Sequence, residues 1–307
     1  MKILLLGKNG QVGWELAQAL LPLGEVIALD RQQMDFVNLE ALRLTIHAIH
    51  PDLIVNAAAY TAVDKAESEQ ENTFLCNATA VDAIAQEAKK IGALLIHYST
   101  DYIFDGTKNS PYLENDVVNP LNVYGESKLA GENAIIVSGV DYLILRTTWV
   151  FAARGQNFLK SILRLAAERD TLNIVADQIG APTWARVIAQ TTAHIIQQVK
   201  QERENKLFVS GVFHLTSAGD TSWHGFAQKI VELASPHCQL KTHVISPIPT
   251  SQYPTPAKRP LNSRLCTDKL TQRFGVVMPT WETSLKLCME ELFCSRNCKT
   301  IASTLKI

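Results

Sequence analysis

Short apolar runs alternate with amphipathic segments through the first half of the chain. Five runs have the length and composition of buried strands: Lys2–Leu6, Glu25–Leu29, Leu53–Asn56, Leu94–Tyr98 and Tyr142–Arg146. The segments between them repeat apolar residues with helical spacing: Gly13–Leu21, Leu39–His50, Asn72–Ile91 and Ser127–Val137. Strands that are apolar almost throughout are typical of a parallel sheet covered by helices on both faces. The pattern therefore predicts an α/β fold with a doubly wound parallel sheet.

The second half of the chain is less regular. It predicts helices over Phe158–Arg169, Ala185–Lys200 and Trp223–Ala234, and a strand over Val212–Thr216. A proline-rich run from Ser246 to Pro260 excludes a regular helix and predicts an ordered extended loop. The last residues, 295–307, show little apolar periodicity, and we expect them to be frayed.

Three glycines mark a candidate nucleotide site at the end of the first predicted strand. Gly7, Gly10 and Gly13 have the spacing G-x-x-G-x-x-G, with a strand before them and a helix after them. Glycine allows a tight turn, and it lets backbone N–H groups approach a pyrophosphate at a helix N-terminus. In this context the pattern indicates a Rossmann-type dinucleotide site, and a purely structural turn is the alternative.

The end of the second predicted strand bears on the choice of cofactor. Asp30 lies at the offset expected for the acid that binds the adenosine ribose, which favours NAD. Arg31 follows it, and its guanidinium could accept the 2′-phosphate of NADP. Because the two residues favour different cofactors, the sequence predicts NADPH or NADH without choosing between them. Asp35 and Phe36 are placed to contact adenine, although Phe36 is equally consistent with a core residue.

A third candidate cofactor contact follows the third predicted strand, in VNAAAYTAVD. Small side chains after Asn56, ending at Ala59, let the backbone approach a bound cofactor. Tyr60 and Thr61 then offer hydroxyl groups. Close packing between a strand and a helix is the alternative explanation for the alanines.

Tyr124 and Lys128 stand four residues apart in YGESK, where a helical pattern begins. This spacing places both side chains on one face of the helix. A tyrosine hydroxyl, with a pKa of about 10, needs its phenolate stabilised before it can act near neutral pH. A nearby ammonium group, aided by an oxidised nicotinamide, supplies that stabilisation. The pair can then give a proton to a carbonyl oxygen as hydride arrives at its carbon, although Y-x-x-x-K alone is common by chance.

Together with Ser99 and Thr100 at the end of the fourth predicted strand, these motifs resemble the extended short-chain dehydrogenase/reductases. Up to Phe293 the chain is similar to the dTDP-4-dehydrorhamnose reductase family, through GKNGQVGWEL, VNAAAYTAVDKAE, HYSTDYIFDG, PLNVYGESKLAGE, RTTWVF, DQIGAPT and YPTPAKRPLNSRL. The resemblance implies reduction of the C4 ketone of dTDP-4-dehydro-L-rhamnose by NADPH or NADH. This is the last step in making dTDP-L-rhamnose, a precursor of lipopolysaccharide and other surface polysaccharides.

The resemblance also implies roles for individual residues. Those expected around the cofactor are Gly7, Gly10, Gln11, Val12, Gly13, Asp30, Arg31, Asp35, Phe36, Ala59, Tyr60 and Thr61. Tyr124 would donate the proton, and Lys128 would bind the nicotinamide ribose and lower the pKa of Tyr124. Thr100 would form a hydrogen bond near the reacting oxygen. The family is described as assisted by Mg²⁺, but no ligand spacing for this metal is visible, and Glu15 is only a guess.

The expected contacts with the sugar nucleotide come from both halves of the chain. They are Thr100, Asp101, Trp149, Asn157, Phe158, Gln178, Thr183, Arg259 and Asn262. Arg259 follows the proline-rich run, and a guanidinium suits a diphosphate, whereas a plain surface charge is the alternative. We therefore expect two domains: residues 1–150 to bind NAD(P), and residues 151–307 to bind the substrate, with part of this second half packing on the first domain.

Two other functions remain open. Dehydratases of the same fold carry Asp-Glu after the threonine, but here Tyr102 follows Asp101, which disfavours dehydration. Epimerisation at C3 and C5 needs further bases, and none is identified. A non-catalytic role is the third interpretation, because the regulatory subunit of methionine adenosyltransferase resembles this family. The presence of Thr100, Tyr124 and Lys128 together argues for an enzyme.

Composition limits the classes of partner. The 307 residues are 47% hydrophobic and 19% charged with a net charge of −1, as in a soluble globular protein without a general attraction for nucleic acid or membranes. The start, MKILLLGKNG, indicates a buried strand and not a signal peptide, so we expect a cytoplasmic protein with reduced cysteines. Cys288, Cys294 and Cys298 lack the usual zinc spacing. A dTDP-sugar is the expected partner, and a homodimer is left open.

Overall fold

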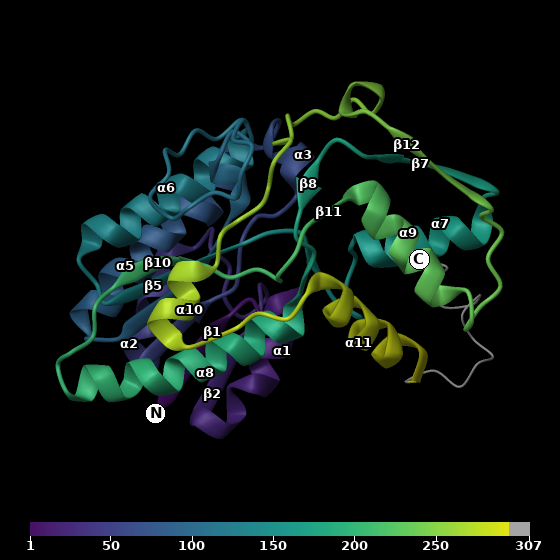
Figure 1. Cartoon of the computed structure of the whole chain (residues 1–307). Coiled ribbons are helices and arrows are strands. Elements are labelled where there is room, and N and C mark those ends of the chain that lie inside the picture. The colour runs from purple at the N-terminus through teal and green to yellow at the C-terminus, as the bar shows by residue number, and fades with distance from the viewer. Residues whose placement is uncertain (295–307) are drawn as a thin grey trace.

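A parallel sheet forms the centre of the larger lobe in the computed structural model, which describes residues 1–294 (Figure 1). Its strand order, within that range, is β10-β5-β4-β3-β1-β2, and all neighbours are parallel. The strands are β1 Lys2–Leu6, β2 Glu25–Leu29, β3 Leu53–Asn56, β4 Leu94–Thr100, β5 Tyr142–Thr147 and β10 Gly211–His214. The predicted doubly wound α/β fold is confirmed. Because the chain changes direction across the sheet after β2, a crevice opens at the carboxyl ends of β1 and β3.

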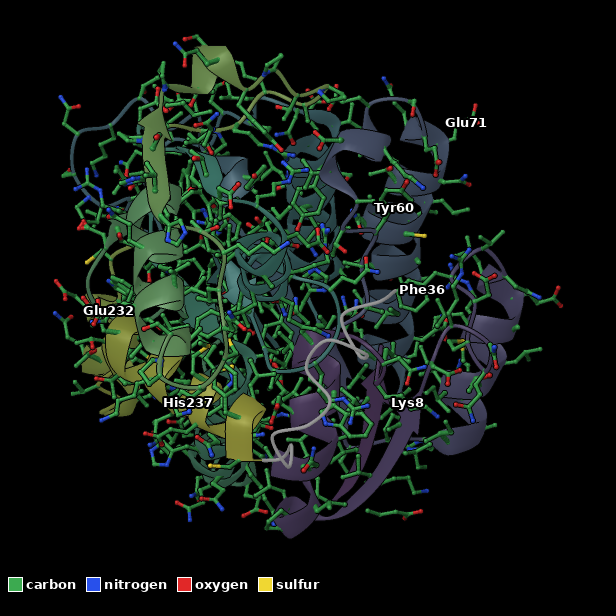
Figure 2. All side chains as sticks on the ribbon, turned by 90° about the vertical axis from the view of Figure 1, so that its right-hand side faces the viewer. Lys8, Phe36, Tyr60, Glu71, Glu232 and His237 are labelled. Atoms are coloured by element: carbon green, nitrogen blue, oxygen red, sulfur yellow. The ribbon has the colours of Figure 1, made fainter. Side chains whose placement is uncertain are left out.

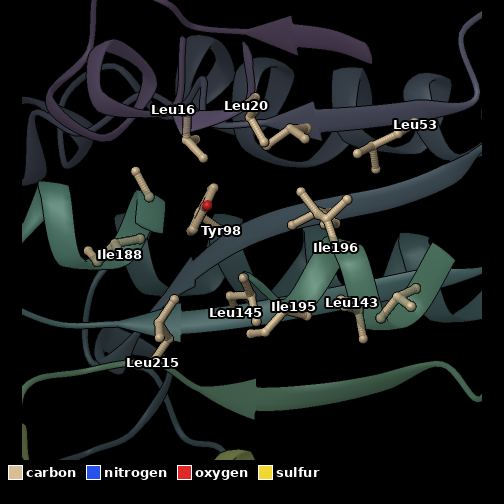
Figure 3. Close-up of a cluster of buried hydrophobic side chains, with 14 of the residues drawn as sticks. Leu16, Leu20, Leu53, Tyr98, Leu143, Leu145, Ile188, Ile195, Ile196 and Leu215 are labelled. Carbon is tan, nitrogen blue, oxygen red and sulfur yellow. The ribbon is translucent and has the colours of Figure 1, made fainter. Parts of the chain in front are cut away.

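Helices cover both faces of this sheet. One face carries α1 Gln11–Ala19, α8 Ala185–Glu204 and α10 Asp268–Phe274; the other carries α2 Leu39–Ile49, α5 Ala80–Lys90 and α6 Val123–Ser138. Figure 3 shows the first of the two resulting cores, where Leu16 and Leu20 of α1 and Ile188 of α8 pack with side chains from the sheet. Burial of these apolar side chains on both faces explains why the strands read as continuous apolar runs.

The region predicted as one helix over Asn72–Ile91 is divided into three segments. They are α4 Gln70–Phe74, the π-helical turn η2 Leu75–Thr79 and α5. The turn is stabilised by Asn77, whose side chain bonds to the backbone of Tyr60 and to Ser127. Such tertiary partners are invisible in a local pattern. The remaining short elements of this half are η1 Leu21–Leu23, α3 Val63–Ala66 and η3 Asp101–Ile103.

A smaller lobe, at right in Figure 1, is built from the second half of the chain. Its helices are α7 Phe158–Glu168, α9 Trp223–Ala234 and α11 Trp281–Cys294, and they enclose a third apolar core. Its strands are paired as β7 Thr171–Val175 with β12 Val244–Ile248, β6 Val150–Phe151 with β9 Thr183–Trp184, and β8 Ile179–Gly180 with β11 Thr221–Ser222. A short turn, η4 Thr250–Gln252, follows β12.

The predicted helices and strand of this half are confirmed, but the prediction for the proline-rich run is partly wrong. The proline-rich run is not a loop throughout, because its first residues, including Pro247, belong to β12. Pro247 is tolerated because β12 pairs with β7 alone within the described sheet, so a strand edge is available for the missing N–H. β7, α10 and α11 were not predicted. The fraying expected for residues 295–307 lies outside the described residues.

Parts of the second half return to the larger lobe. Strand β10 pairs with β5 at the sheet edge, with Gly211 opposite Leu143, and α8 packs against α1. The domain division at residue 150 stays a prediction, and any such division has to assign these elements to the nucleotide-binding side.

An ion pair is buried between α6 and β5. Nε and Nη2 of Arg146 donate to the two carboxylate oxygens of Glu132 at 2.9 and 2.7 Å, and Nη1 donates to the carbonyl of Glu114. The side chains of Arg146 and Glu132 are 6% and 1% exposed. A charge left alone in such a place is costly, so each partner depends on the other.

We predict that Arg146→Met destabilises the fold by about 3–5 kcal/mol, because it leaves the Glu132 carboxylate buried without its partner. Urea denaturation measures the change in the free energy of unfolding. Arg164→Met is the matched control, since it removes an exposed pair with Glu168 on α7 and should cost no more than about 0.5 kcal/mol. Equal losses in the two variants would contradict this account of the buried pair.

Candidate active site

The glycine turn after β1 brings two stretches of backbone into close contact. Gly7 has a φ of 88°, and a Cβ there would lie 2.7 Å from the backbone nitrogen of Ala58, which follows β3. A Cβ on Gly13 would lie 2.0 Å from the carbonyl oxygen of Gly7. Only glycine fits at either position without moving the backbone. The N-terminus of α1 is thereby held at the carboxyl edge of the sheet, where backbone N–H groups can receive a pyrophosphate.

A cavity of about 560 Å³ extends from this turn along the carboxyl edge of the sheet. All the predicted cofactor residues line it except Gly13, which lies beneath the turn. Figure 2 shows three residues around this region, Lys8, Phe36 and Tyr60, on the same side of the molecule. Lining residues that the sequence analysis did not assign to the site include Asn9, Met34, Cys76, Thr147, Gly155 and Gln156. Gly155 and Gln156 come from the loop after β6, and no sequence motif around them indicates a place in the site.

Asp30 lines the cavity and is held by several hydrogen bonds. Its Oδ1 accepts from the backbone N–H groups of Gln32 and Gln33, and its Oδ2 lies 3.2 Å from Nδ2 of Asn9 and 3.5 Å from Nζ of Lys8. Burial opposes ionisation, but the Gln33 N–H and the Lys8 ammonium outweigh it, so the pKa of Asp30 is lowered. The carboxylate is thus ionised and already paired with a cation.

Tyr124 and Lys128 both line the cavity from the first turns of α6. The helix starts earlier than predicted because Oδ1 of Asn122 caps it by accepting from the N–H of Gly125 at 2.8 Å. Desolvation raises the pKa of Tyr124, while a hydrogen bond with Thr100 opposes the rise. Lys128 donates to the carbonyl of Tyr98 at 2.7 Å. The hydrogen bond with Thr100 therefore favours the Tyr124 phenolate in this structure.

The residues after Thr100 carry one acid and one aromatic ring. Asp101 is buried, which raises its pKa to about 6, and its Oδ1 accepts from the Thr100 hydroxyl at 3.1 Å. The ring of Tyr102 packs edge-on against Tyr124, with centroids 5.6 Å apart. Burial raises the pKa of Tyr102 to about 12, so it stays a neutral phenol. The site thus holds one carboxyl group at this strand end, without the adjacent pair that water removal would use.

Arg259 lies on the other side of Tyr102. Its Nη2 forms an ion pair with Asp64 at 2.8 Å, and its Nη1 is 3.4 Å from the Tyr102 hydroxyl. Asp64 also accepts from the backbone N–H of Ala257. These contacts attach the end of the proline-rich run to α3 and hold Arg259 beside Tyr102.

Aromatic residues from distant parts of the chain form a cluster around Trp149. The indoles of Trp149 and Trp223 stack with centroids 3.6 Å apart, and Phe158 lies 4.6 Å from Trp223. Trp223 donates to Oε1 of Gln178 at 3.1 Å. Trp149 has a φ of 45°, a strained value for a bulky residue that often marks a functional site. Gly180 makes room for it, since a Cβ there would meet the indole at 2.6 Å.

Three other predicted substrate residues have partners within the protein. Nδ2 of Asn157 donates to Gln11 in the cavity, and its Oδ1 caps α7. Thr183 lies in β9 and not in a loop, and its hydroxyl is bonded between Ala181 and Ser217. The amide of Asn262 donates to the carbonyls of two loop residues. A substrate contact for Thr183 and Asn262 stays a prediction, and their present bonds are structural.

The guess that Glu15 binds Mg²⁺ does not fit the structure. Arg186 binds the Glu15 carboxylate with two N–H groups, at 2.9 and 3.3 Å, and also pairs with Glu291 at 2.7 Å. The position beside Glu15 that a cation would occupy is held by a guanidinium. Across residues 1–294, no group of three or more His, Cys, Asp or Glu side chains is arranged to hold a metal ion. No step of the chemistry is assigned to a metal.

Comparison with known proteins identifies the family. The model of the family described as RmlD substrate binding domain matches residues 1–294. The chain is 52% identical to the dTDP-4-dehydrorhamnose reductase of Burkholderia thailandensis, over 95% of this chain and 99% of that protein. It is 50% identical to the enzyme of the same name from Escherichia coli strain K12, over 95% and 98%. The chain belongs to the dTDP-4-dehydrorhamnose reductase family.

Solved structures of this family have the same fold. The dTDP-4-dehydrorhamnose reductase of Clostridium acetobutylicum superposes with a TM-score of 0.87 at 36% identity, over 95% of this chain and 99% of that one. The reductase of Bacillus anthracis, solved in complex with NADP, has a TM-score of 0.85 at 32% identity, over 94% and 99%. The glycine turn and the cavity beside it therefore belong to a fold that holds a nicotinamide dinucleotide. Of the helices in the described part of the chain, none is long and apolar enough to cross a membrane.

We predict that Gly13→Ala weakens binding of NADPH at least tenfold, because the new methyl group overlaps the Gly7 carbonyl and forces the turn away from α1. Titration of the intrinsic tryptophan fluorescence with NADPH measures the affinity. Gln18→Ala, on the exposed side of the same helix, should bind the cofactor like the parent protein. Unchanged affinity in folded Gly13→Ala would exclude the turn from the cofactor site.

Proposed function

We propose that this protein is an oxidoreductase that reduces the C4 ketone of dTDP-4-dehydro-L-rhamnose to the alcohol of dTDP-L-rhamnose, using NADPH or NADH. The observation that carries the proposal is the position of Tyr124, which lines the cavity and is hydrogen-bonded to Thr100 at the carboxyl end of β4. A phenol held in that position is suited to protonate a carbonyl oxygen. The family of the chain supplies the identity of the ketone.

The side chains around the ketone have separate tasks in this proposal. The reduced nicotinamide supplies the hydride that is added to C4. Tyr124 gives its proton to the C4 oxygen, and Thr100 orients the Tyr124 hydroxyl. The Thr100 hydroxyl then turns its one proton from Asp101 to Tyr124 and stabilises the phenolate left behind. Lys128 binds the nicotinamide ribose. Water is kept away by the edge-on ring of Tyr102 and its neighbours.

The sugar nucleotide is proposed to lie between the two lobes. Asp101 and Trp149 contact the sugar ring, while Phe158 and Gln178 contribute to the same aromatic surface around Trp223. Arg259 has one side free of its Asp64 pair to approach the diphosphate, whose charge a guanidinium recognises bidentately. Residues up to 150 would carry the cofactor, and the smaller lobe would carry the substrate.

Dehydration, epimerisation and a regulatory role are less consistent with this site. Tyr102 remains a neutral phenol where a dehydratase would carry its second acid. Epimerisation at C3 and C5 would use further bases, and Asp101 is the one carboxyl group at the strand end. A binding subunit has no use for Tyr124 and Thr100 placed together at the cavity. A cytoplasmic location and a homodimer stay predictions.

Use of both cofactors follows from the charges at the adenosine end. Asp30 can accept from a ribose hydroxyl, as NADH needs, although its charge is already offset by Lys8. That offset reduces the repulsion that a 2′-phosphate would meet. Arg31 is 84% exposed and only loosely paired with Asp35 at 4.0 Å, so its guanidinium is available to the phosphate. We propose that the protein accepts NADPH and NADH.

The function is tested by supplying dTDP-4-dehydro-L-rhamnose with NADPH or NADH and following the loss of absorbance of the reduced nicotinamide. The parent protein should oxidise the cofactor. Tyr124→Phe should lower kcat by roughly 10²–10⁴ and keep cofactor affinity, because it removes only the proton donor. Tyr253→Phe, which alters an exposed hydroxyl, is the control and should keep kcat. Absence of oxidation with either cofactor would refute the proposal.

Cofactor choice has its own test. Arg31→Ala should lower kcat/KM for NADPH about tenfold relative to NADH, since it removes a charge-assisted bond of more than about 1.4 kcal/mol to the 2′-phosphate. Initial rates with each cofactor at saturating sugar nucleotide give the ratio. Arg164→Ala, which removes an exposed ion pair on α7, should leave the ratio unchanged. An equal loss with both cofactors would place Arg31 away from the phosphate.

A further inference from the structure

Three buried polar side chains form a row that ends at Lys128, one of the two proposed catalytic residues of α6. Asn56 at the end of β3 and His97 in β4 are register partners in the sheet, and Lys128 reaches His97 from α6. Their exposed fractions are 1%, 0% and 2%. At such depth an unmatched donor or acceptor is costly, so donors and acceptors have to alternate along the row.

The backbone fixes the orientation of the Asn56 amide. Its Oδ1 accepts from the N–H of Ala58 at 3.1 Å, and its Nδ2 therefore faces Nδ1 of His97, also at 3.1 Å. A rotated amide would place two donors, Nδ2 and the Ala58 N–H, in contact. An amide nitrogen can only donate, so Nδ1 of His97 has to be the acceptor. In a neutral ring the proton then lies on Nε2.

The other end of the ring faces the catalytic lysine. Burial, and then the charge of Lys128, hold the pKa of His97 well below its usual range, so the ring is neutral. Nε2 of His97 lies 3.0 Å from Nζ of Lys128, and Nζ is also 2.7 Å from the carbonyl oxygen of Tyr98. An amine can accept the Nε2 proton and donate to that carbonyl, whereas an ammonium group has no acceptor. The row is fully matched only when Lys128 is an amine.

Protonation of Lys128 disturbs the whole row. An ammonium group has to donate to Nε2, which moves the ring proton to Nδ1. There it meets the Nδ2 donor of Asn56, whose orientation the Ala58 N–H does not allow to change. The mismatch is carried by Asn56 and His97 and acts on Lys128 through one hydrogen bond.

The other titratable groups near Lys128 are Tyr124 and Glu132 on the same helix, since the Tyr98 hydroxyl is bonded to Thr192 on the opposite face of the sheet. Glu132 favours the ammonium form, but its carboxylate is bound to Arg146 on β5. Burial outweighs Glu132 and lowers the pKa of Lys128 to about 8. Lys128 can therefore change charge in the range where such an enzyme works, and the row acts in the same direction as burial.

We propose that Asn56 and His97 are positioning residues that disfavour the ammonium form of Lys128 and so set the pH at which Tyr124 has a charged neighbour. The proposal rests on the proposed reductase function for the roles of Tyr124 and Lys128. Neither Asn56 nor His97 is among the described residues that line the cavity, so both act through Lys128.

The tautomer of His97 provides a test that needs no activity. In protein with ¹⁵N-labelled histidine at about pH 9, above the lowered pKa of Lys128, NMR should show the His97 ring proton on Nε2. The His97 signals are identified by their loss in His97→Gln. In Asn56→Asp the carboxylate accepts from the ring, and the proton should move to Nδ1. A ring proton on Nδ1 in the parent protein would overturn the proposal.

The pH profile of kcat provides the second test. Activity that needs the Lys128 ammonium group falls as pH rises through the pKa of Lys128. His97→Gln presents an acceptor toward Lys128 directly, and Asn56→Asp does so through the His97 ring. In both variants the pH at which kcat falls should therefore rise by about one unit or more, which is a tenfold change in the ratio of ammonium to amine. A purely structural role would lower stability or kcat without changing this pH.

Matched measurements separate the possible outcomes. Asn77→Asp adds a carboxylate at another buried asparagine, bonded to Ser127 of the same helix, and should raise the pH at which kcat falls less than Asn56→Asp does. NADPH affinity and thermal unfolding establish that each variant is folded. The proposal would be overturned if the pH at which kcat falls is unchanged in folded Asn56→Asp and His97→Gln, or if it rises equally in Asn77→Asp. If the parent protein does not reduce the sugar nucleotide, the proposed function fails, and the tautomer measurement still decides the role of His97.

Discussion

The close contact between the glycine turn and the backbone after β3 is the constraint on which the site depends. Gly7 and Ala58 approach so closely that no side chain fits between them, and Gly13 lies against the Gly7 carbonyl. This contact brings the N-terminus of α1 to the carboxyl edge of the sheet. It also fixes where β3 ends, and therefore where Asn56 meets His97 across the sheet. The cavity and the polar row of Asn56, His97 and Lys128 thus both depend on this backbone contact.

The proposed catalytic geometry is built from buried polar groups whose partners come from separate elements. Thr100 at the end of β4 is bonded to Tyr124 on α6, and Lys128 on the same helix is bonded to β4. Helix α6 is itself tied to β5 by the Arg146–Glu132 pair. Because each bond is shielded from water, small shifts of α6 would leave several polar groups unmatched. The proposed proton donor, Tyr124, is therefore positioned by the same bonds that stabilise the larger lobe.

The proposed substrate side is formed differently, from aromatic rings and the proline-rich run. Trp149 adopts a strained backbone conformation beside Gly180 and stacks on Trp223, while Arg259 is attached to α3 through Asp64. These residues come from loops and short strands in the second half, where pattern-based prediction was weakest. That division is physical, since loops obtain their shape from tertiary contacts and not from hydrophobic periodicity.

The sequence by itself determined the doubly wound sheet and the strands of its first half, and the residues that it predicted for the cofactor all line the cavity except Gly13. Apolar strands, glycines at a turn and the spacing of Tyr124 and Lys128 are local signals that depend on backbone geometry. Only the tertiary structure decided that Arg186 occupies the place beside Glu15, that Trp223 stacks on Trp149, and that His97 stands between Asn56 and Lys128. Each of these pairs joins residues far apart in the chain, and a local pattern does not record which distant side chain will satisfy a buried charge or donor.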